Sequence, residues 1–554
     1  MSAAETPLAQ RLYPFGEERD AADATRVRMR DGVHLATDVY LPAGHRRGPA
    51  ILIRMPYDKC GRYSFIPEIA GYLTEHGYVV VAQDVRGKFR SEGEREPFVH
   101  EVRDGWDTIE WVVGQSWSDG VVGMIGDSYY GFTQWAAAAS GHPALRAIVP
   151  RVTGSRLASQ LQTGGVTPLS KVEWVADVWS FDSMLESGYI DWSTRPLEEL
   201  VPAELENARR LLREAREPRD QLAVVFPDGP PAPRLKIPAL QVTGWWDNIK
   251  GPQLRDWADV QRAPAAAHQH LRLTITDHQD LEFALDGRAP EDMLASEAAL
   301  ERYLPRLLDV PLVFFDRWLR GNDAAERLPR VAYQVANGDW HHADAWPPPE
   351  ARELLLHLAD GGRATAGADG GALATDADTQ TAVARWTHDP NDPVPTGVEV
   401  EWEILRDLPD ERAIHARPDV ATFTGAPAPA AVDLVGSATA ELVVGAAAPS
   451  TQVVATLCDV APSGRAHLVA EGVACPQLGD EGEARCTVDL GAIGYRLLPG
   501  HRLRLAVASS RYPRYLLHPG TGEDPWTALG RPAEQWLRTG VAAGSVLRLA
   551  VLPS

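Results

Sequence analysis

The clearest chemical signal in the sequence is a serine between two glycines. Ser128 lies in the segment GDSYYG of residues 126–131, directly after the apolar run 121–125 and directly before the small-residue run 132–139. Glycines two residues before and three residues after a serine allow a tight strand-to-helix turn, which exposes the hydroxyl at the carboxyl edge of a sheet. Serine is also a preferred helix N-cap, but the coincidence of strand, turn and helix favours a nucleophile. We therefore predict that Ser128 attacks a carbonyl carbon.

A serine hydroxyl is a weak nucleophile until a base removes its proton, so a histidine and an orienting carboxylate should follow in the order Ser, Asp, His. Asp247 and His278 fit this order, since each comes shortly after a predicted strand, at 237–243 and 271–275. An Asx turn or a helix cap is the structural alternative for Asp247. The rival carboxylates are Asp256, Asp277 and Asp280, and the rival imidazoles are His142, His268 and His270. Position at a strand end favours Asp247 and His278.

A tetrahedral alkoxide needs hydrogen-bond donors, and the first should be the backbone N–H of Tyr129, which follows the nucleophile. The second donor is less obvious, because the sequence has no HGGG run. The predicted strand 50–54 leads into MPYDK, where the phenol of Tyr57 could face the alkoxide. Packing as an ordinary aromatic side chain is the alternative for Tyr57.

Aromatic side chains could form the apolar walls of a substrate cleft between the inserted helical segment and the α/β domain, although most of them could equally belong to a core. The candidates are Trp174, Trp179, Phe181, Trp245 and Trp246. The chemistry of a serine, a histidine and a carboxylate requires no metal and no cofactor.

The elements that would position these residues alternate between strands and helices in the first 150 residues, which is typical of a mostly parallel sheet covered by helices. The predicted strands are 50–54, 78–83, 121–125 and 147–150, followed later by 237–243 and 271–275, and the predicted helices are 66–75 and 104–113. The sequence therefore predicts an α/β domain whose carboxyl edge carries the candidate residues.

One different sequence pattern interrupts this α/β alternation, and another follows it. Residues 154–233 read as an inserted helical segment with helices at 172–185 and 198–216, and a proline cluster ends it. After the hinge Pro347–Pro349 strands follow strands, which predicts a sandwich or jelly roll. The predicted strands there are 353–358, 398–405, 438–444, 452–460, 467–473, 484–490, 502–508 and 545–551, with a surface loop at 361–371.

Length and charge exclude several classes of protein. The 554 residues are too many for one hydrophobic core, so several domains are expected. A formal charge of −22 without any basic cluster argues against binding to nucleic acid. No uninterrupted apolar run is long enough for a spanning helix, so no membrane partner is expected.

The start of the chain and the cysteines bear on the compartment. Residues 1–20 contain several charges and no continuous apolar stretch, so no secretory signal is read and a cytoplasmic location is expected. Cys60, Cys458, Cys475 and Cys486 are too scattered for a disulfide framework or a zinc site. Cys475 and Cys486 could face each other across a hairpin, but free thiols are the expected state in the cytoplasm.

The sequence resembles the CocE/NonD family of serine hydrolases, which includes cocaine esterase, α-amino-acid ester hydrolases and X-prolyl dipeptidyl peptidases. The resemblance covers nearly the whole chain. The motifs that carry it are RMPYDK at 54–59, DVRG at 84–87, QSW at 115–117, GDSYYG at 126–131, GWWD at 244–247, FDRWLRG at 315–321, WPP at 346–348, DVAP at 459–462 and GHRLRL at 500–505. In place of the Gly-Pro-Trp that is common before the family's histidine segment, this chain has Thr274–Asp277.

The resemblance implies an α/β-hydrolase catalytic domain in two parts, 1–153 and 234–346, a helical cap at 154–233, and a C-terminal β jelly roll at 347–554. It also implies a triad of Ser128, Asp247 and His278, with Tyr57 and Tyr129 as oxyanion donors. The implied activity is hydrolysis of an ester or amide of a small molecule through an acyl-enzyme.

Three other functions remain open from the sequence. They are an acyltransferase with the same triad, an aminopeptidase of the X-prolyl dipeptidyl type, and a noncatalytic protein whose jelly roll binds a glycan or a partner. The sequence also leaves the natural substrate open, as well as the choice between a monomer and a homo-oligomer.

Overall fold

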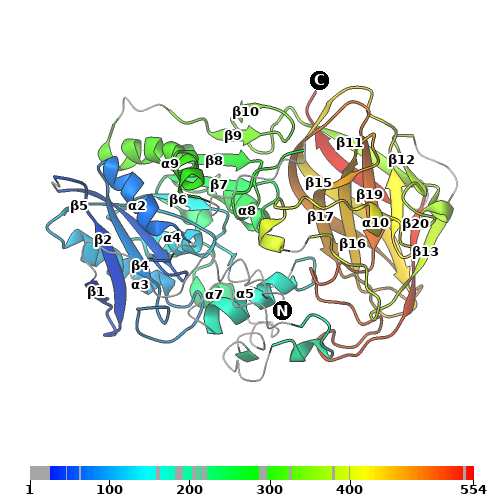
Figure 1. The fold of residues 1–554 in the computed structure, drawn as a ribbon, viewed down its shortest axis with the longest axis horizontal. Helices are drawn as coiled ribbons and strands as arrows, with labels where there is room; N and C mark the ends of the chain where they lie inside the picture. Colours follow the sequence, from blue (N-terminus) through cyan, green and yellow to red (C-terminus); the bar gives the residue numbers. More distant parts are fainter. Residues whose placement is uncertain are drawn as a thin grey trace, which may run out of the picture.

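The computed structural model describes residues 25–44, 47–61, 64–157, 163–180, 191–201, 209–210, 213, 221–285, 296–322, 327–376, 381–398, 400–540 and 544–553. The strands of these residues form two sheets, which stand at opposite ends of the long axis of the molecule (Figure 1). An N-terminal α/β domain holds the first sheet and a C-terminal β-rich domain holds the second. Both domains were predicted from the sequence.

The first sheet has ten strands within the described residues, in the order β1-β2-β4-β3-β5-β6-β7-β8-β9-β10. It is parallel from β4 to β9 and antiparallel at its two edges. Parallel strands are buried on both faces, which explains why the central strands read as unbroken apolar runs. The strands are β1 (Thr25–Arg28), β2 (His34–Tyr40), β3 (Gly48–Met55), β4 (Val79–Asp84), β5 (Ser118–Asp127), β6 (Leu145–Arg151), β7 (Ala239–Gly244), β8 (Gln269–Thr274), β9 (Val331–Gln334) and β10 (Trp340–Ala343).

Helices cover both faces of this sheet. Successive side chains of a strand point to opposite faces, so Leu52 of β3 shares a hydrophobic cluster with Ile109, whereas Ile53 shares another with Ile69 and Phe315. The helices are α2 (Ile66–Glu75), α3 (Glu101–Val113), α4 (Ser128–Ser140), α8 (Lys250–Val260) and α9 (Glu297–Arg320). Among the described residues, no helix is long and apolar enough to cross a membrane.

The chain between β6 and β7 contributes helical turns that connect the two domains. Its described elements are α5 (Leu169–Ser180), η3 (Leu197–Glu199), α7 (Gln221–Val225) and η4 (Ala232–Arg234). The N–H of Leu169 donates to the carbonyl of Arg514 at 2.9 Å, so α5 begins against the C-terminal domain. The predicted helix at 172–185 corresponds to α5 as far as residue 180. Most of the predicted helix at 198–216 lies outside the described residues.

The second sheet joins eleven strands of the described chain and begins after Pro349. Its strands are β11 (Arg352–Ala359), β12 (Gly371–Ala374), β13 (Ala382–His388), β14 (Ala421–Thr424), β15 (Val432–Ala446), β16 (Val453–Val460), β17 (Ala466–Ala474), β18 (Glu483–Leu497), β19 (Arg502–Ala508), β20 (Ala533–Thr539) and β21 (Val546–Val551), with the short helices η6 (Gly361–Arg363), η7 (Glu401–Glu403) and α10 (Arg412–His415). All four cysteines are free thiols, as expected.

The strand predicted at 398–405 is wrong. This segment contains the short helix η7 instead, and it packs against the loop after β8. The backbone N–H of Leu405 donates to a carboxylate oxygen of Asp277 at 3.0 Å rather than to a neighbouring strand. A tertiary contact therefore overrides the β propensity of the apolar residues in this segment.

Close packing of α4 against the end of β6 depends on Gly131. A Cβ at this position would lie 2.5 Å from Cγ2 of Thr153. We predict that Gly131→Ala lowers the free energy of unfolding by about 1–3 kcal/mol, because the strand end or the helix must move. Gly71 of α2 is a matched control, since a Cβ there meets nothing within 4 Å.

Gly71→Ala should leave stability unchanged or raise it by up to about 1 kcal/mol, because alanine has the higher helix propensity. Urea denaturation followed by circular dichroism measures both variants. Equal stabilisation by the two substitutions would contradict the packing described here.

Candidate active site

Ser128 occupies a strained turn at the carboxyl end of β5. It begins α4 with a φ of 52°, in the left-handed region that residues with a Cβ rarely adopt. A Cβ on Gly126 would lie 2.1 Å from the ring of Tyr130, so only glycine fits two residues before the serine. The Thr153 hydroxyl donates to the Ser128 carbonyl at 2.6 Å. The half-buried serine is thus held at the sheet edge, in the turn that the sequence predicts.

Asp247 and His278 form a hydrogen-bonded pair at the same edge of the sheet. Asp247 lies three residues past β7 and His278 four residues past β8, and these strands are parallel neighbours. The distance from His278 Nδ1 to Asp247 Oδ1 is 2.8 Å, and both side chains are buried. The Thr243 hydroxyl and the Ile249 N–H also donate to the Asp247 carboxylate, at 2.7 and 3.0 Å.

These contacts keep the Asp247 carboxylate ionised. Burial alone raises its pKa, but the hydrogen bond and charge of His278, together with the Thr243 and Ile249 donors, outweigh burial and leave the pKa below its ordinary value. An ionised carboxylate accepts the Nδ1–H of the imidazole, which leaves Nε2 free to act as a base.

The rival carboxylates bind other groups. Asp256 pairs with Arg156 at 2.9 Å, Asp280 pairs with Arg151 at 2.6 Å, and Asp277 accepts backbone N–H groups. The rival histidines also contact other groups. His142 Nε2 lies 3.0 Å from Glu110, and His270 Nδ1 lies 2.9 Å from the Pro329 carbonyl. The His268 ring packs on Trp318. Among the candidates from the sequence, the structure therefore brings together Asp247 and His278.

Tyr57 and the Tyr129 backbone converge beside Ser128. Tyr57 follows β3, and its phenol oxygen is hydrogen-bonded to the Ser128 side chain and to the backbone N–H of Tyr129. Trp174 Nε1 on α5 also donates to this oxygen at 3.3 Å. Burial raises the pKa of Tyr57 to about 12, against the smaller opposing effect of these hydrogen bonds, so the phenol is neutral and keeps its proton.

The Tyr129 side chain anchors this turn to α3. Its hydroxyl donates to Glu101 at 2.9 Å and accepts the Phe98 N–H at 2.8 Å. The other carboxylate oxygen of Glu101 accepts from Arg54 at 2.7 Å, and the guanidinium and both carboxylate oxygens are buried. A buried ion pair of this kind fixes the backbone of residue 129, whose N–H faces Tyr57.

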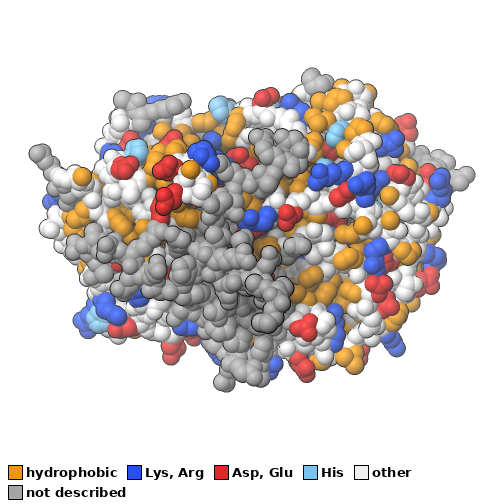
Figure 2. Space-filling model, in the orientation of Figure 1, with side chains coloured by type: hydrophobic (Ala, Val, Ile, Leu, Met, Phe, Trp, Pro, Cys, Tyr) orange, Lys and Arg blue, Asp and Glu red, His pale blue; other side chains and the backbone are white. Residues whose placement is uncertain are grey.

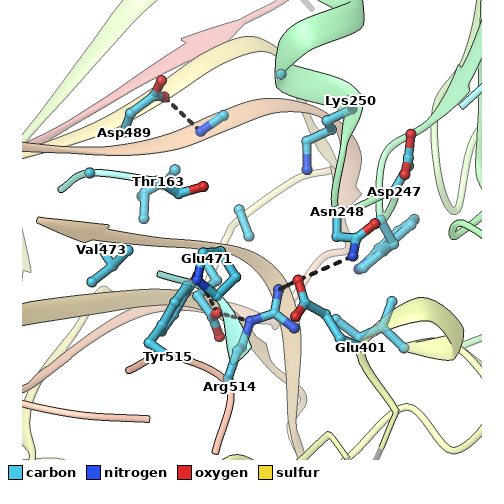
Figure 3. A pocket seen from close by; sticks show the side chains of 18 of the residues that line it. Thr163, Asp247, Asn248, Lys250, Glu401, Glu471, Val473, Asp489, Arg514 and Tyr515 are labelled. Atoms are coloured by element: carbon cyan, nitrogen blue, oxygen red, sulfur yellow. Dashed lines mark hydrogen bonds and ion pairs between the residues drawn. The ribbon is translucent and has the colours of Figure 1, made fainter. Parts of the chain in front are cut away.

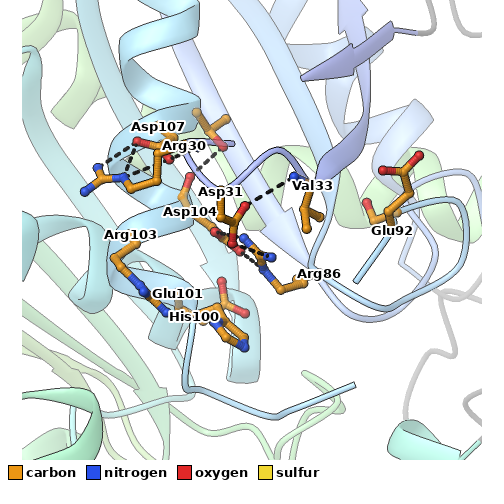
Figure 4. Close-up of polar contacts among 12 residues, drawn as sticks. Arg30, Asp31, Val33, Arg86, Glu92, His100, Glu101, Arg103, Asp104 and Asp107 are labelled. Carbon is orange, nitrogen blue, oxygen red and sulfur yellow. Dashed lines mark hydrogen bonds and ion pairs between the residues drawn. The ribbon is translucent and has the colours of Figure 1, made fainter. Parts of the chain in front are cut away.

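The start of α3 is itself tied to neighbouring loops by ion pairs (Figure 4). Arg86, from the DVRG motif, donates to both oxygens of Asp104 at 2.9 and 2.7 Å and lies 2.9 Å from Asp31. One turn farther along α3, Arg30 binds Asp107 through two nitrogens. These contacts hold the helix that carries Glu101.

The predicted pocket aromatics occupy different environments. Trp174 is half-buried and touches Tyr57, whereas Trp179 is fully buried, with its ring centroid 5.4 Å from that of Tyr129. Trp245 and Trp246 are also buried, and they line a cavity that includes Asp247. Phe181 lies outside the described residues. Of these side chains, Trp174 has the contact that best fits a substrate pocket.

Two residues beside the candidate site were not found from the sequence. The ring of Trp402 lies 4.9 Å from that of His278, between centroids, but it stands in the segment that was predicted as a strand. Arg151 donates to Asp127 at 2.8 Å and to Asp280 at 2.6 Å, so it joins the neighbours of Ser128 and His278. A charged residue at the end of the buried strand β6 is the signal that could have indicated Arg151.

Comparisons with known proteins agree with this architecture. Residues 31–280 match the family model of X-Pro dipeptidyl-peptidase (S15 family), and residues 322–546 match that of the X-Pro dipeptidyl-peptidase C-terminal non-catalytic domain. A cocaine esterase from Rhodococcus sp. (strain MB1 Bresler) is 30% identical, over 90% of this chain and 92% of the relative.

Solved structures show the same fold over the whole chain. An aminopeptidase from the marine sediment archaeon Thaumarchaeota archaeon has a TM-score of 0.79 at 22% identity, covering 100% of this chain and 99% of its own. An α-amino acid ester hydrolase has a TM-score of 0.76 at 23% identity, and the match covers 100% of each chain. With the full-length relative and the two family models, the conclusion is that this chain belongs to the CocE/NonD family of serine hydrolases.

Proposed function

We propose that this chain hydrolyses an ester of a small-molecule carboxylic acid through an acyl-enzyme on Ser128. The observation that carries the proposal is the 2.8 Å contact between Asp247 and His278, at the sheet edge that also presents Ser128. The cocaine esterase similar to this chain supports an ester as the substrate bond. The X-Pro dipeptidyl-peptidase family models make an amide the second candidate.

In the proposed first step, His278 Nε2 takes the proton of the Ser128 hydroxyl as its oxygen attacks the carbonyl carbon. Asp247 remains ionised, accepts the Nδ1–H and stabilises the imidazolium that forms. The carbonyl oxygen becomes an alkoxide. Collapse of this intermediate expels the alcohol, which receives the proton from His278, and leaves the acyl group on Ser128. Water then attacks the acyl carbon, with His278 again as the base.

Tyr57 and Tyr129 are the proposed donors to the alkoxide. In the structure the Tyr129 N–H bonds to the phenol oxygen, so both groups already face one place next to Ser128. A substrate oxygen that enters there would accept the Tyr57 O–H and the Tyr129 N–H together. Donors that are fixed before the reaction stabilise developing charge without reorganisation.

Arg151 is a proposed positioning residue for this reaction. It is buried and bridges Asp127, directly before the nucleophile, and Asp280, two residues after the base. Tyr303 of α9 also donates to Asp280 at 3.0 Å. The bridge therefore fixes the turn that holds Ser128 relative to the loop that holds His278.

The proposed domain division has a catalytic part at 1–153 and 234–346, a cap at 154–233 and a C-terminal part at 347–554. It is supported by the strand content of the two sheets, which runs over 25–343 and 352–551. Four free thiols support the proposed cytoplasmic location. On the face shown in Figure 2, acidic and basic side chains of the described residues are interspersed, which fits a small-molecule substrate rather than a nucleic acid.

Loss of the nucleophile should abolish turnover without loss of the fold. We predict that Ser128→Ala lowers kcat for an aryl ester by about 10⁶-fold, because neither base nor donors can replace the hydroxyl. A stopped assay with p-nitrophenyl butyrate measures the rate, and circular dichroism checks the fold. Ser140→Ala, at the other end of α4, is the control and should retain full activity. Comparable activity of both variants would reject Ser128 as the nucleophile.

Removal of one oxyanion donor should lower kcat more than it changes KM. We predict that Tyr57→Phe lowers kcat by about 10²–10³-fold, since the phenol binds the alkoxide more strongly than the substrate carbonyl. The phenol is a donor only while protonated, and its pKa of about 12 lies above the assay range. The ratio of wild-type to variant kcat should thus stay constant from about pH 7 to about pH 10 and fall only near pH 12. If the ratio of wild-type to variant kcat already declined at a pH under about 9, the phenol would not be a neutral donor.

Loss of the Arg151 bridge should affect both activity and stability. We predict that Arg151→Met lowers the free energy of unfolding by about 3–5 kcal/mol, because two carboxylates lose their buried partner. It should also lower kcat with a smaller change in KM, since the positions of base and nucleophile change. Arg146→Met is a control on the same strand, because Arg146 is exposed. If Arg151→Met and Arg146→Met had the same kcat and the same urea midpoint, Arg151 would have no positioning role.

A further inference from the structure

The cavity lined by Trp245, Trp246 and Asp247 has a volume of about 300 Å³ and lies where three parts of the chain meet (Figure 3). Thr163 and Lys171 line it from the segment around α5. Asn248, in the turn after β7, and Lys250, the first residue of α8, line it from the α/β domain, and Glu471, Asp489 and Arg514 line it from the C-terminal domain. Its described lining includes Asp247 but neither Ser128 nor Tyr57. The cavity is therefore a separate feature from the nucleophile and its oxyanion donors.

Most carboxylates around this cavity already have partners. Asp247 binds His278, Asn248 donates to Glu401 at 3.2 Å, and Tyr515 donates to Glu471 at 2.8 Å. Arg514 lies between the two glutamates and forms an ion pair with each of them. Figure 3 shows the two glutamates with Asn248, Arg514 and Tyr515 along one side of the cavity. The positive charge of Arg514 is thus neutralised by the protein.

Two lysines on the cavity wall have no such partner. Lys171 is 8% exposed, and its ammonium group lies over the ring of Trp402, 4.5 Å from the centroid. The Lys250 side chain points into the open space of the cavity in Figure 3. Within the described part of the chain, neither ammonium group has a hydrogen bond or an ion pair. Lys171 is buried and Lys250 is half-buried. An ammonium group that is partly removed from water without a partner costs free energy, which an anion in the cavity would offset.

The unpaired charges and the walls indicate which anion fits. Besides the two ammonium groups, the lining holds Asp489, which accepts the Gly491 N–H at 2.8 Å, and the exposed Arg255. Lys250 is the ammonium group that points into the open space, so a ligand with a single carboxylate matches it. Ile404, Leu468 and Leu490 contribute apolar parts of the cavity wall. A volume near the lower end for ligand sites suits a molecule of a few carbon atoms.

We propose that this cavity binds a small organic monocarboxylate, whose carboxylate pairs with Lys250 beside the positive charge of Lys171 and whose apolar part contacts Ile404, Leu468 and Leu490. A bound anion contacts residues from all three segments and stabilises their junction. The site takes a ligand that the proposed ester hydrolysis does not require, so it is independent of whether Ser128 is the nucleophile.

The test is thermal unfolding of the full chain with sodium butyrate, compared with its uncharged analogue butyramide at the same ionic strength. Butyrate should raise the midpoint temperature by a few degrees in a saturable way, because it binds the folded state, and butyramide should not. The shift should be lost in Lys250→Met and reduced in Lys171→Met. It should persist in Lys236→Met, a control at an exposed lysine, and in Ser128→Ala.

Without butyrate, Lys250→Met should be at least as stable as the wild-type chain, because an apolar side chain replaces an unpaired, half-buried charge. Binding elsewhere, including next to Ser128, would leave the butyrate shift intact in Lys250→Met and overturn the proposal. Equal shifts with butyrate and butyramide, or no shift with either, would overturn it as well.

Discussion

The hydrogen bond between His278 and Asp247 joins the ends of two neighbouring parallel strands, β8 and β7. Parallel strands bring their carboxyl ends to one edge of a sheet, so residues that are 31 positions apart in the chain meet there. Ser128 reaches the same edge from β5 through a turn that its φ of 52° makes costly for a residue with a Cβ. The rest of the architecture is needed to keep that edge fixed.

Buried ion pairs hold the residues at this sheet edge in position. Arg151 joins the residue before Ser128 to the loop that carries His278, and the pair of Arg54 with Glu101 holds Tyr129 through its hydroxyl. A buried pair adds little net stability compared with apolar packing, but removal of one partner is costly. The pairs around this site are therefore better understood as devices for position than as sources of stability. The strain at Ser128 is consistent with this view, because a strained turn persists only when its surroundings determine it.

The α/β fold and the candidate residues were predictable because they follow from local signals. The elbow around Ser128, and the positions of Asp247 and His278 just past strands, can be read from glycine spacing and apolar runs. Trp402 could not be found in this way, because the segment 398–405 has the composition of a strand and is held instead by the contact of Leu405 with Asp277. The burial of Trp245 and Trp246 could not be predicted for the same reason. The Trp245 N–H donates to the Gln334 carbonyl in β9, and the Trp246 N–H donates to the Leu468 carbonyl in β17 of the other domain. Contacts between distant segments leave no periodic pattern in the sequence.

In the proposed mechanism, the imidazole of His278 activates the hydroxyl of Ser128. The most direct measurement is the rate of reaction with a fluorophosphonate, followed by peptide mass spectrometry, in the wild-type chain and in His278→Gln. We expect one adduct, on Ser128 of the wild-type chain, and labelling that is slower by several orders of magnitude in His278→Gln, with the fold retained. An adduct on another residue, or undiminished labelling of Ser128 in His278→Gln, would contradict this mechanism.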